Sequence, residues 1–273
     1  MVQFLTQNYG FDRNDMVILT DDQQNSRAIP TRQNMIDAMQ WLVAGAQPGD
    51  NLFFHYSGHG GQTEDLDGDE EEGYDETIYP VDFQQTQPGH IVDDILHDIM
   101  VRPLPPGCRL TAVFDCCHSG SILDLPYMYS TKGVLKEPSL LKDAGMGLLG
   151  IGEAYLRNDM GGILSGATSL FERVSHSAGG NQEKVKQAKT APADVICFTG
   201  CKDTQTSADA SIGGQGQGAM SYAFRTALNK YGGQLSYLQL LNVVREEMAN
   251  GNYSQKPQLS ACHPIDLNLR FTL

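Results

Sequence analysis

A histidine and two adjacent cysteines, each placed where an apolar run ends, are the residues of this chain best suited to chemistry. His59 follows Leu52-Phe-Phe-His-Tyr-Ser-Gly58, while Cys116 and Cys117 follow Arg109-Leu-Thr-Ala-Val-Phe-Asp115. Such runs are typical of buried strands, and open α/β sheets carry their reactive groups where strands end. A neighbouring imidazole lowers the pKa of a thiol and later protonates the leaving amine. The pattern therefore predicts a cysteine nucleophile with a histidine base.

The residues around this pair predict how a substrate would be held. Glycines beside His59 allow backbone N–H groups to approach a substrate carbonyl, and we assign the oxyanion donors to Gly60 and Cys117. Because side chains alternate along an extended segment, Asp115 shares a face with Cys117, whereas Cys116 faces the opposite way. A carboxylate there suits a cationic substrate side chain. The alternative for Asp115 is a hydrogen-bond acceptor that supports neighbouring groups.

The elements that must position these residues alternate between strand and helix. This alternation predicts an α/β fold whose mainly parallel sheet is covered by helices on both faces. Thr31 is expected to cap a helix, and residues 125–193 lack firm periodicity, which is typical of a mobile loop or processing linker. The expected strands are 15–20, 52–58, 77–80, 109–115, 194–200 and 266–273. Besides the helix that Thr31 caps, the expected helices are 91–101, 219–231 and 236–249.

Composition limits the classes of partner. The chain has 273 residues, a formal net charge of −14, a pI of about 4.7 and a mean hydropathy of −0.32. This acidity argues against nucleic acid and anionic membranes and suits metal ions or basic peptides. No apolar run approaches the roughly 20 residues of a membrane span, and no leader peptide is expected. The six cysteines show no disulfide framework, which favours a reducing compartment.

An acidic run between Glu64 and Glu76 contains no basic residue. Its aspartates have partial EF-hand spacing, but Glu70 stands where the calcium loop needs glycine for its sharp turn. We therefore reject an EF-hand and expect most of this run to be solvated.

Two motifs, His55-Tyr-Ser-Gly-His-Gly-Gly61 and Asp115-Cys-Cys-His-Ser-Gly120, together resemble the type I metacaspases of fungi, which are caspase-like cysteine peptidases. The resemblance extends across the chain. It implies a caspase-like fold in which residues 1–190 form a large-subunit-like region and residues 191–273 a small-subunit-like region, together one domain.

The resemblance also implies the activity and its residues. It implies cleavage after Arg or Lys by a His59–Cys117 dyad, with Asp115 and Ser57 in the pocket for the basic side chain. It further implies activation by Ca²⁺, for which hard oxygen ligands are suited. The matching calcium ligands are Asp75, Asp93, Asp94 and Asp124.

Self-processing at basic residues is a further implication of the resemblance, together with a role in cell death, stress responses or protein quality control. The substrates would be proteins or peptides with Arg or Lys before the scissile bond. We expect a monomer, located in the cytoplasm and also in the nucleus. The candidate processing sites are Lys132, Lys136, Lys184, Lys186 and Lys189.

One departure from the family pattern leaves other functions open. The family's first strand, and the second pocket acid in the turn that follows it, are absent from this chain. We expect their absence to leave unpaired sheet edges beside the cysteine strand. The alternatives are therefore a truncated, catalytically impaired caspase-fold scaffold or a calcium-binding module without peptidase activity.

Overall fold

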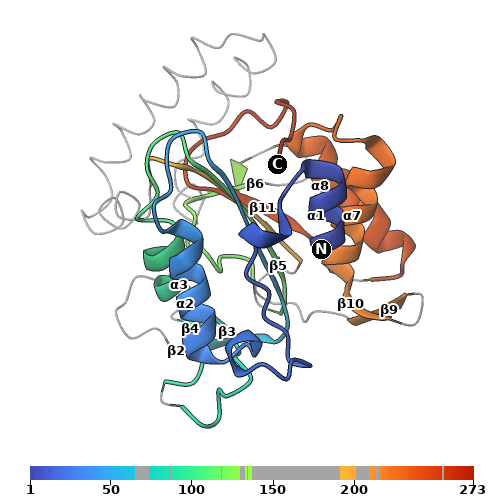
Figure 1. The fold of residues 1–273 in the computed structure, drawn as a ribbon. Coiled ribbons are helices and arrows are strands. Elements are labelled where there is room, and N and C mark those ends of the chain that lie inside the picture. The colour runs from blue at the N-terminus through green and yellow to red at the C-terminus, as the bar shows by residue number, and fades with distance from the viewer. Residues whose placement is uncertain are drawn as a thin grey trace. The chain divides into compact units, whose positions relative to one another are not determined.

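The computed structural model describes residues 1–64, 74–86, 88–117, 119–129, 133, 135–136, 191–200, 209–212, 215–253 and 255–273. Residues 1–135 and 189–273 form one compact unit, and residues 136–188 form a second. The first unit contains every helix of the described residues (Figure 1).

A six-stranded mixed sheet forms the centre of the first unit. Strands β1, β5 and β8 are parallel, and β11 is antiparallel to both β8 and β6. In sheet order the strands are β1 (Asn51–Ser57), β5 (Arg109–Asp115), β8 (Asp194–Thr199), β11 (Gln258–Ala261), β6 (Tyr127–Tyr129) and β7 (Leu135–Lys136). The strand that leads to Cys117 is therefore paired on both sides, with β1 and with β8.

Helices cover both faces of the sheet, as the alternating pattern predicted (Figure 1). Successive residues of β5 point to opposite faces. Val113 packs with α1, α7 and α8, whereas Phe114 packs with α2 and α3. The helices are α1 (Val2–Tyr9), α2 (Arg32–Val43), α3 (Asp93–Met100), α7 (Ala219–Tyr231) and α8 (Tyr237–Asn250).

Several smaller elements surround the carboxyl ends of the parallel strands. A three-stranded antiparallel sheet contains β2 (Gly60–Glu64), β3 (Tyr74–Ile78) and β4 (Ile91–Val92). A hairpin of β9 (Asp209–Ile212) and β10 (Gln215–Gly218) leads directly into α7. Two short 3₁₀ helices lie near the amino terminus, η1 (Arg13–Asp15) and η2 (Ser26–Ala28).

Most of the predicted elements are confirmed, and local signals explain why. The Thr31 hydroxyl accepts a hydrogen bond from the backbone N–H of Asn34 at 3.3 Å, so it caps α2 as predicted. Ser236 forms a capping box with Gln239 at the start of α8. The expected helix at 91–101 is shorter, because its first two residues form β4 instead.

Two predicted strands are wrong. Residues 16–20 form no strand, and residues 266–273 form a turn with a single bridge from Arg270 to Ser236. The first segment is a continuous apolar run and the second alternates in polarity, but neither pattern by itself provides a partner strand for a ladder. Within the predicted loop of 125–193, β6 and β7 were not expected, and residues 137–190 lie outside the described residues.

The expected unpaired edges beside β5 are also not found, because β1 and β8 fill both positions. Within the described part of the chain, the two edge strands of this sheet are β1 and β7, and β5 lies inside it. None of the helices in that part combines the length and apolar character needed to cross a bilayer.

Candidate active site

His59 lies in a tight connection between two sheets. Strand β1 ends at Ser57, and the N–H of Gly58 donates to the carbonyl of Asp115 at 3.3 Å, which extends the β1–β5 pairing by one step. Strand β2 begins at Gly60. The His59 side chain between them is exposed. The histidine is thus held by backbone pairing on both sides while its ring faces solvent.

The loop of His59 contacts the loop of Cys117 directly. The backbone of Gly60 lies so close to the carbonyl oxygen of Cys117 that a Cβ at this position would overlap it. The same Cβ would lie 3.2 Å from both Cβ and Sγ of Cys116. Only glycine permits this approach, and it places the residue after His59 against the predicted nucleophile.

The structure separates the two cysteines. Cys116 is 0% exposed and packs with Phe114 in the core under α2 and α3. Cys117 is partly exposed. The carbonyl of Cys116 accepts a hydrogen bond from the Ser119 hydroxyl at 3.1 Å, which fixes the turn after the cysteines. Cys117 is therefore the thiol that a substrate can reach, and Cys116 faces away from Asp115 as predicted.

Asp115 has a structural partner that the sequence did not indicate. Its side chain is 2% exposed, and Oδ2 accepts a hydrogen bond from the backbone N–H of Ser221 at 2.6 Å. Ser221 lies in the first turn of α7, where Gly218 provides no side-chain cap. A Cβ on Gly218 would overlap the Asp115 carboxylate. The carboxylate thus caps a helix from another part of the chain, where the helix dipole favours negative charge.

This arrangement bears out the acceptor alternative for Asp115, and binding of a substrate cation stays a prediction. Ser57, the other predicted pocket residue, is exposed and is the register partner of Asp115 across the β1–β5 pair. The two predicted pocket residues are therefore neighbours on adjacent strands.

His55 supports the same helix. Its Nε2 lies 2.8 Å from the hydroxyl of Ser221. Burial, and next the positive charges of the amino terminus and Arg225, lower the pKa of His55 to about 4. Its burial and its contact with the Ser221 hydroxyl make His55 a structural residue.

Three of the four predicted calcium ligands gather at the small sheet. Carboxylate oxygens of Asp75, Asp93 and Asp94 lie within 4.8 Å of one another. Burial, and next the charge of Asp124, raise the pKa of Asp93 to about 10. All four predicted ligands thus belong to one group of carboxylates, Asp75, Asp93, Asp94 and Asp124, which we call the acidic cluster. Clustered carboxylates with little solvent fit a hard divalent cation, which would balance their charge.

Backbone hydrogen bonds hold this acidic cluster in shape. Asp93 Oδ2 accepts from the N–H of Glu76 at 2.8 Å, and Oδ1 accepts from the N–H of Asp94 at 3.0 Å. Asp124 has a φ of 50°, a left-handed conformation that is uncommon outside glycine, and its N–H donates to the carbonyl of Ser121 at 2.5 Å. The carboxylates are therefore positioned by strands and turns.

The acidic cluster is linked to the loop after Cys117. The Ser121 hydroxyl donates to Oε2 of Glu76 at 2.6 Å, and Nδ1 of His97 lies 2.8 Å from the carbonyl of Leu123. Glu76 is only 3% exposed, so the expectation of a solvated acidic run is wrong at this residue. It is buried because β3 lies between β2 and β4.

The structure locates one of the five predicted processing sites. Lys132, Lys184, Lys186 and Lys189 lie outside the described residues, and Lys136 belongs to the two-residue strand β7.

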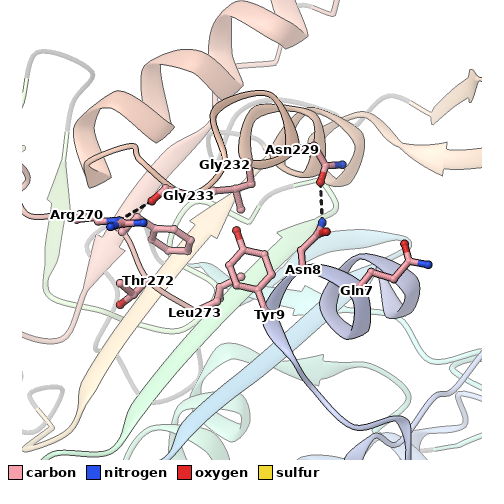
Figure 2. A pocket seen from close by; sticks show the side chains of 11 residues that line it. Gln7, Asn8, Tyr9, Asn229, Gly232, Gly233, Arg270, Thr272 and Leu273 are labelled. Atoms are coloured by element: carbon pink, nitrogen blue, oxygen red, sulfur yellow. Dashed lines mark hydrogen bonds between the residues drawn. The ribbon is translucent and has the colours of Figure 1, made fainter.

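A cavity of about 490 Å³ lies away from this site, between the end of α1, the end of α7 and the carboxyl-terminal segment (Figure 2). Asn8 donates to the side-chain oxygen of Asn229 at 2.7 Å, and Arg270 donates to the carbonyl of Gly233 at 2.7 Å. Both hydrogen bonds are drawn as dashed lines in Figure 2. Thr272, which also lines the cavity, accepts a hydrogen bond from Arg109 at the first residue of β5. Cys117 lies two residues beyond the opposite end of that strand, so the cavity is not part of the active site.

Three residues of the site were missed by sequence reasoning. Tyr56 hydrogen-bonds the loop of His59, Ser221 binds Asp115, and Ser121 binds Glu76. Tyr56 lies inside the histidine motif, which was a usable signal. Ser221 is far from Asp115 in sequence, and nothing local marks it.

Comparisons with known proteins agree with this geometry. Residues 1–126 match the family described as "Metacaspase, peptidase C14 domain". Metacaspase-1 of Cryptococcus neoformans is 61% identical over 269 residues, which cover 98% of this chain and 58% of that protein. Metacaspase-1A of Aspergillus fumigatus is 62% identical over 275 residues, which cover 100% of this chain and 65% of that protein.

A crystal structure of a Geobacter sulfurreducens protein has the same fold, with a TM-score of 0.51 at 21% identity, and covers 88% of this chain and 78% of that one. The chain spans 58–65% of the length of the two fungal relatives named above. Its motifs, its parallel strands and these matches agree, and the chain belongs to the metacaspase family.

Proposed function

We propose that this chain is a calcium-activated cysteine endopeptidase that cleaves after Arg or Lys with a His59–Cys117 dyad. The observation that carries the proposal is the direct contact between the two loops, where Gly60 lies against the carbonyl of Cys117. The relatives named Metacaspase-1 and Metacaspase-1A support the peptidase class.

In the proposed reaction, His59 accepts the thiol proton and the sulfur of Cys117 attacks the scissile carbonyl. The backbone N–H groups of Gly60 and Cys117 stabilise the oxyanion. Collapse of the intermediate breaks the C–N bond, and His59 gives its proton to the leaving amine. Water, deprotonated by His59, then attacks the acyl-enzyme. The C–S bond then breaks, the new carboxyl terminus leaves, and His59 returns the proton to the sulfur of Cys117.

Specificity for a basic side chain is assigned to Asp115, with Ser57 beside it. The Asp115 carboxylate lies where the helix dipole of α7 and the N–H of Ser221 favour its charged form. The variant Asp115→Asn keeps one oxygen to accept from Ser221 but removes the charge. We expect its kcat/KM for an Arg peptide to fall at least tenfold, with a much smaller change for a citrulline peptide. An equal fall for both peptides contradicts the charge-based assignment.

Calcium is assigned to the cluster of Asp75, Asp93, Asp94 and Asp124. Bound Ca²⁺ supplies positive charge that balances buried carboxylates which otherwise repel one another. The hydrogen bond from Ser121 to Glu76 connects this calcium site to the loop that follows Cys117. Binding is measured by titration calorimetry on the Cys117→Ala variant, which separates it from turnover. Absence of binding at millimolar calcium contradicts the assignment.

Self-processing at Lys132, Lys136, Lys184, Lys186 or Lys189 is part of the proposal, as are roles in cell death or protein quality control in the cytoplasm and nucleus. In calcium, the Cys117→Ala variant should stay intact while the parent chain fragments after a lysine. Equal fragmentation of both chains contradicts self-cleavage. The decisive experiment for the function itself is hydrolysis of an Arg peptide with and without calcium. Calcium binding without hydrolysis of the peptide would identify the chain as a scaffold or a calcium-binding module.

A further inference from the structure

We propose that the hydroxyl of Tyr56 is the positioning group that holds His59 in register with Cys117. The inference rests on the proposed function and extends it to a residue that makes no contact with the reacting atoms.

The carbonyl of His59 is held by two donors from two different elements. The Tyr56 hydroxyl, at the penultimate position of β1, donates at 2.7 Å, and the backbone N–H of Tyr79, which follows β3, donates at 3.2 Å. The Tyr56 hydroxyl also lies 3.3 Å from the carbonyl of Tyr79. A tyrosine hydroxyl has one proton to donate, and the shorter contact takes it. We name this arrangement the carbonyl clamp.

The glycines of the histidine motif fit around the carbonyl clamp. A Cβ on Gly58 would lie 2.7 Å from the Tyr56 hydroxyl oxygen, and a Cβ on Gly61 would lie 2.6 Å from that of Tyr79. The backbone therefore closes over both tyrosine rings, one on each side of His59. The motif is organised around two phenols as well as around the histidine.

The carbonyl clamp acts at the peptide unit that joins His59 to Gly60. Gly60 is the residue that lies against the carbonyl of Cys117. Rotation of this peptide unit would move the imidazole and the contact with Cys117 together. Burial raises the pKa of Tyr56, so its hydroxyl stays protonated and remains a donor at physiological pH. A displacement of about 1 Å at a catalytic group costs about a hundredfold in rate.

The test compares two substitutions that each remove one hydroxyl. Tyr56→Phe removes the donor of the carbonyl clamp and leaves the ring. Tyr129→Phe is the matched control: its buried hydroxyl also bonds main chain, accepting from the N–H of Ile265 at 2.8 Å, but it lies on β6, three places from β5 in the sheet. We measure kcat and KM for an Arg peptide, the rate of Cys117 alkylation by iodoacetamide, and the melting temperature.

We expect Tyr56→Phe to lower kcat by about 10- to 100-fold with KM changed by less than about threefold. Alkylation of Cys117 should slow toward the rate of a His59→Ala variant, because the thiolate depends on the imidazole. Tyr129→Phe should match the parent in kcat and alkylation. Gly58→Ala, which pushes directly on the Tyr56 hydroxyl, should reproduce the loss of Tyr56→Phe.

Parent-like kcat and alkylation in Tyr56→Phe would overturn the inference, as would an equal loss in Tyr129→Phe. A parent chain without turnover contradicts the proposed function and not the carbonyl clamp. In that case the alkylation rates of the parent, Tyr56→Phe and His59→Ala test, without any substrate, whether the Tyr56 hydroxyl positions His59.

Discussion

Replacing Gly60 by alanine is expected to lower kcat about a hundredfold while the chain stays folded. The added methyl would overlap the carbonyl oxygen of Cys117 and lie 3.2 Å from both Cβ and Sγ of Cys116. Because the obstacle is main chain, no side-chain rotation relieves it, and the two loops must separate by on the order of 1 Å. Such a shift at a reacting pair costs about 2.7 kcal/mol of activation free energy, or about a hundredfold.

The alanine keeps its backbone N–H, so the expected effect comes from displacement of the loop and not from removal of a donor atom. The assay is steady-state hydrolysis of an Arg peptide in calcium, with urea unfolding measured on the same samples. Gly10→Ala is the control, because Gly10 has a φ of 73° and nothing within 4 Å of an added Cβ. It should lose about 1 kcal/mol of stability from backbone strain and keep its kcat. A folded Gly60→Ala variant with kcat within threefold of the parent would refute the loop contact.

Three further predictions concern the acidic cluster, an ion pair and the core. Asp93→Asn should weaken calcium binding at least tenfold in calorimetry, because it removes one negative ligand from the cluster, and unchanged affinity contradicts the site. Asp194 raises the pKa of His263, so this pair's contribution is complete below about pH 6.5 and is lost as pH rises through the raised value. Between pH 6 and 8 the urea midpoint of the parent should therefore fall more than that of His263→Gln, and parallel falls contradict the pairing. Phe198 is 0% exposed, and its ring centroid lies 5.3 Å from that of Phe224. Phe198→Ala should therefore lower the free energy of unfolding by about 3–5 kcal/mol in urea titration. A loss below about 1 kcal/mol contradicts the packing.

The elements with strong local signals could be predicted from the sequence. The Thr31 cap set the start of α2, and the apolar runs before His59 and Cys117 set β1 and β5. Strand β11 was missed because Gln258 and Ser260 interrupt its apolar character, yet both are buried between neighbouring strands. The segment 266–273 alternates like a strand but has no ladder partner beyond one bridge. Pairing partners are a property of the fold, and alternation does not reveal them.

The candidate site shows the same division. His59 and Cys117 were marked by residue type at the ends of strands, whereas Asp75, Asp93, Asp94 and Asp124 were indicated by the resemblance to metacaspases. The interaction of Asp115 with Ser221 joins residues from β5 and α7, and only the folded chain brings them together. Glu76 was assigned to solvent by its acidic neighbours, whereas its position on a central strand buries it. Glu64 is exposed at the end of β2, and residues 65–73 of the acidic run lie outside the described residues.

The central claim is that Cys117 is the nucleophile of a peptidase that recognises a basic side chain. The most direct measurement is peptide mapping by mass spectrometry after treatment with a peptidyl-arginine chloromethyl ketone in calcium. We predict one label per chain, on Cys117, with much slower labelling in His59→Ala and by a peptidyl-aspartate reagent. Labelling on Cys116, or equal labelling by the arginine and aspartate reagents, would contradict it.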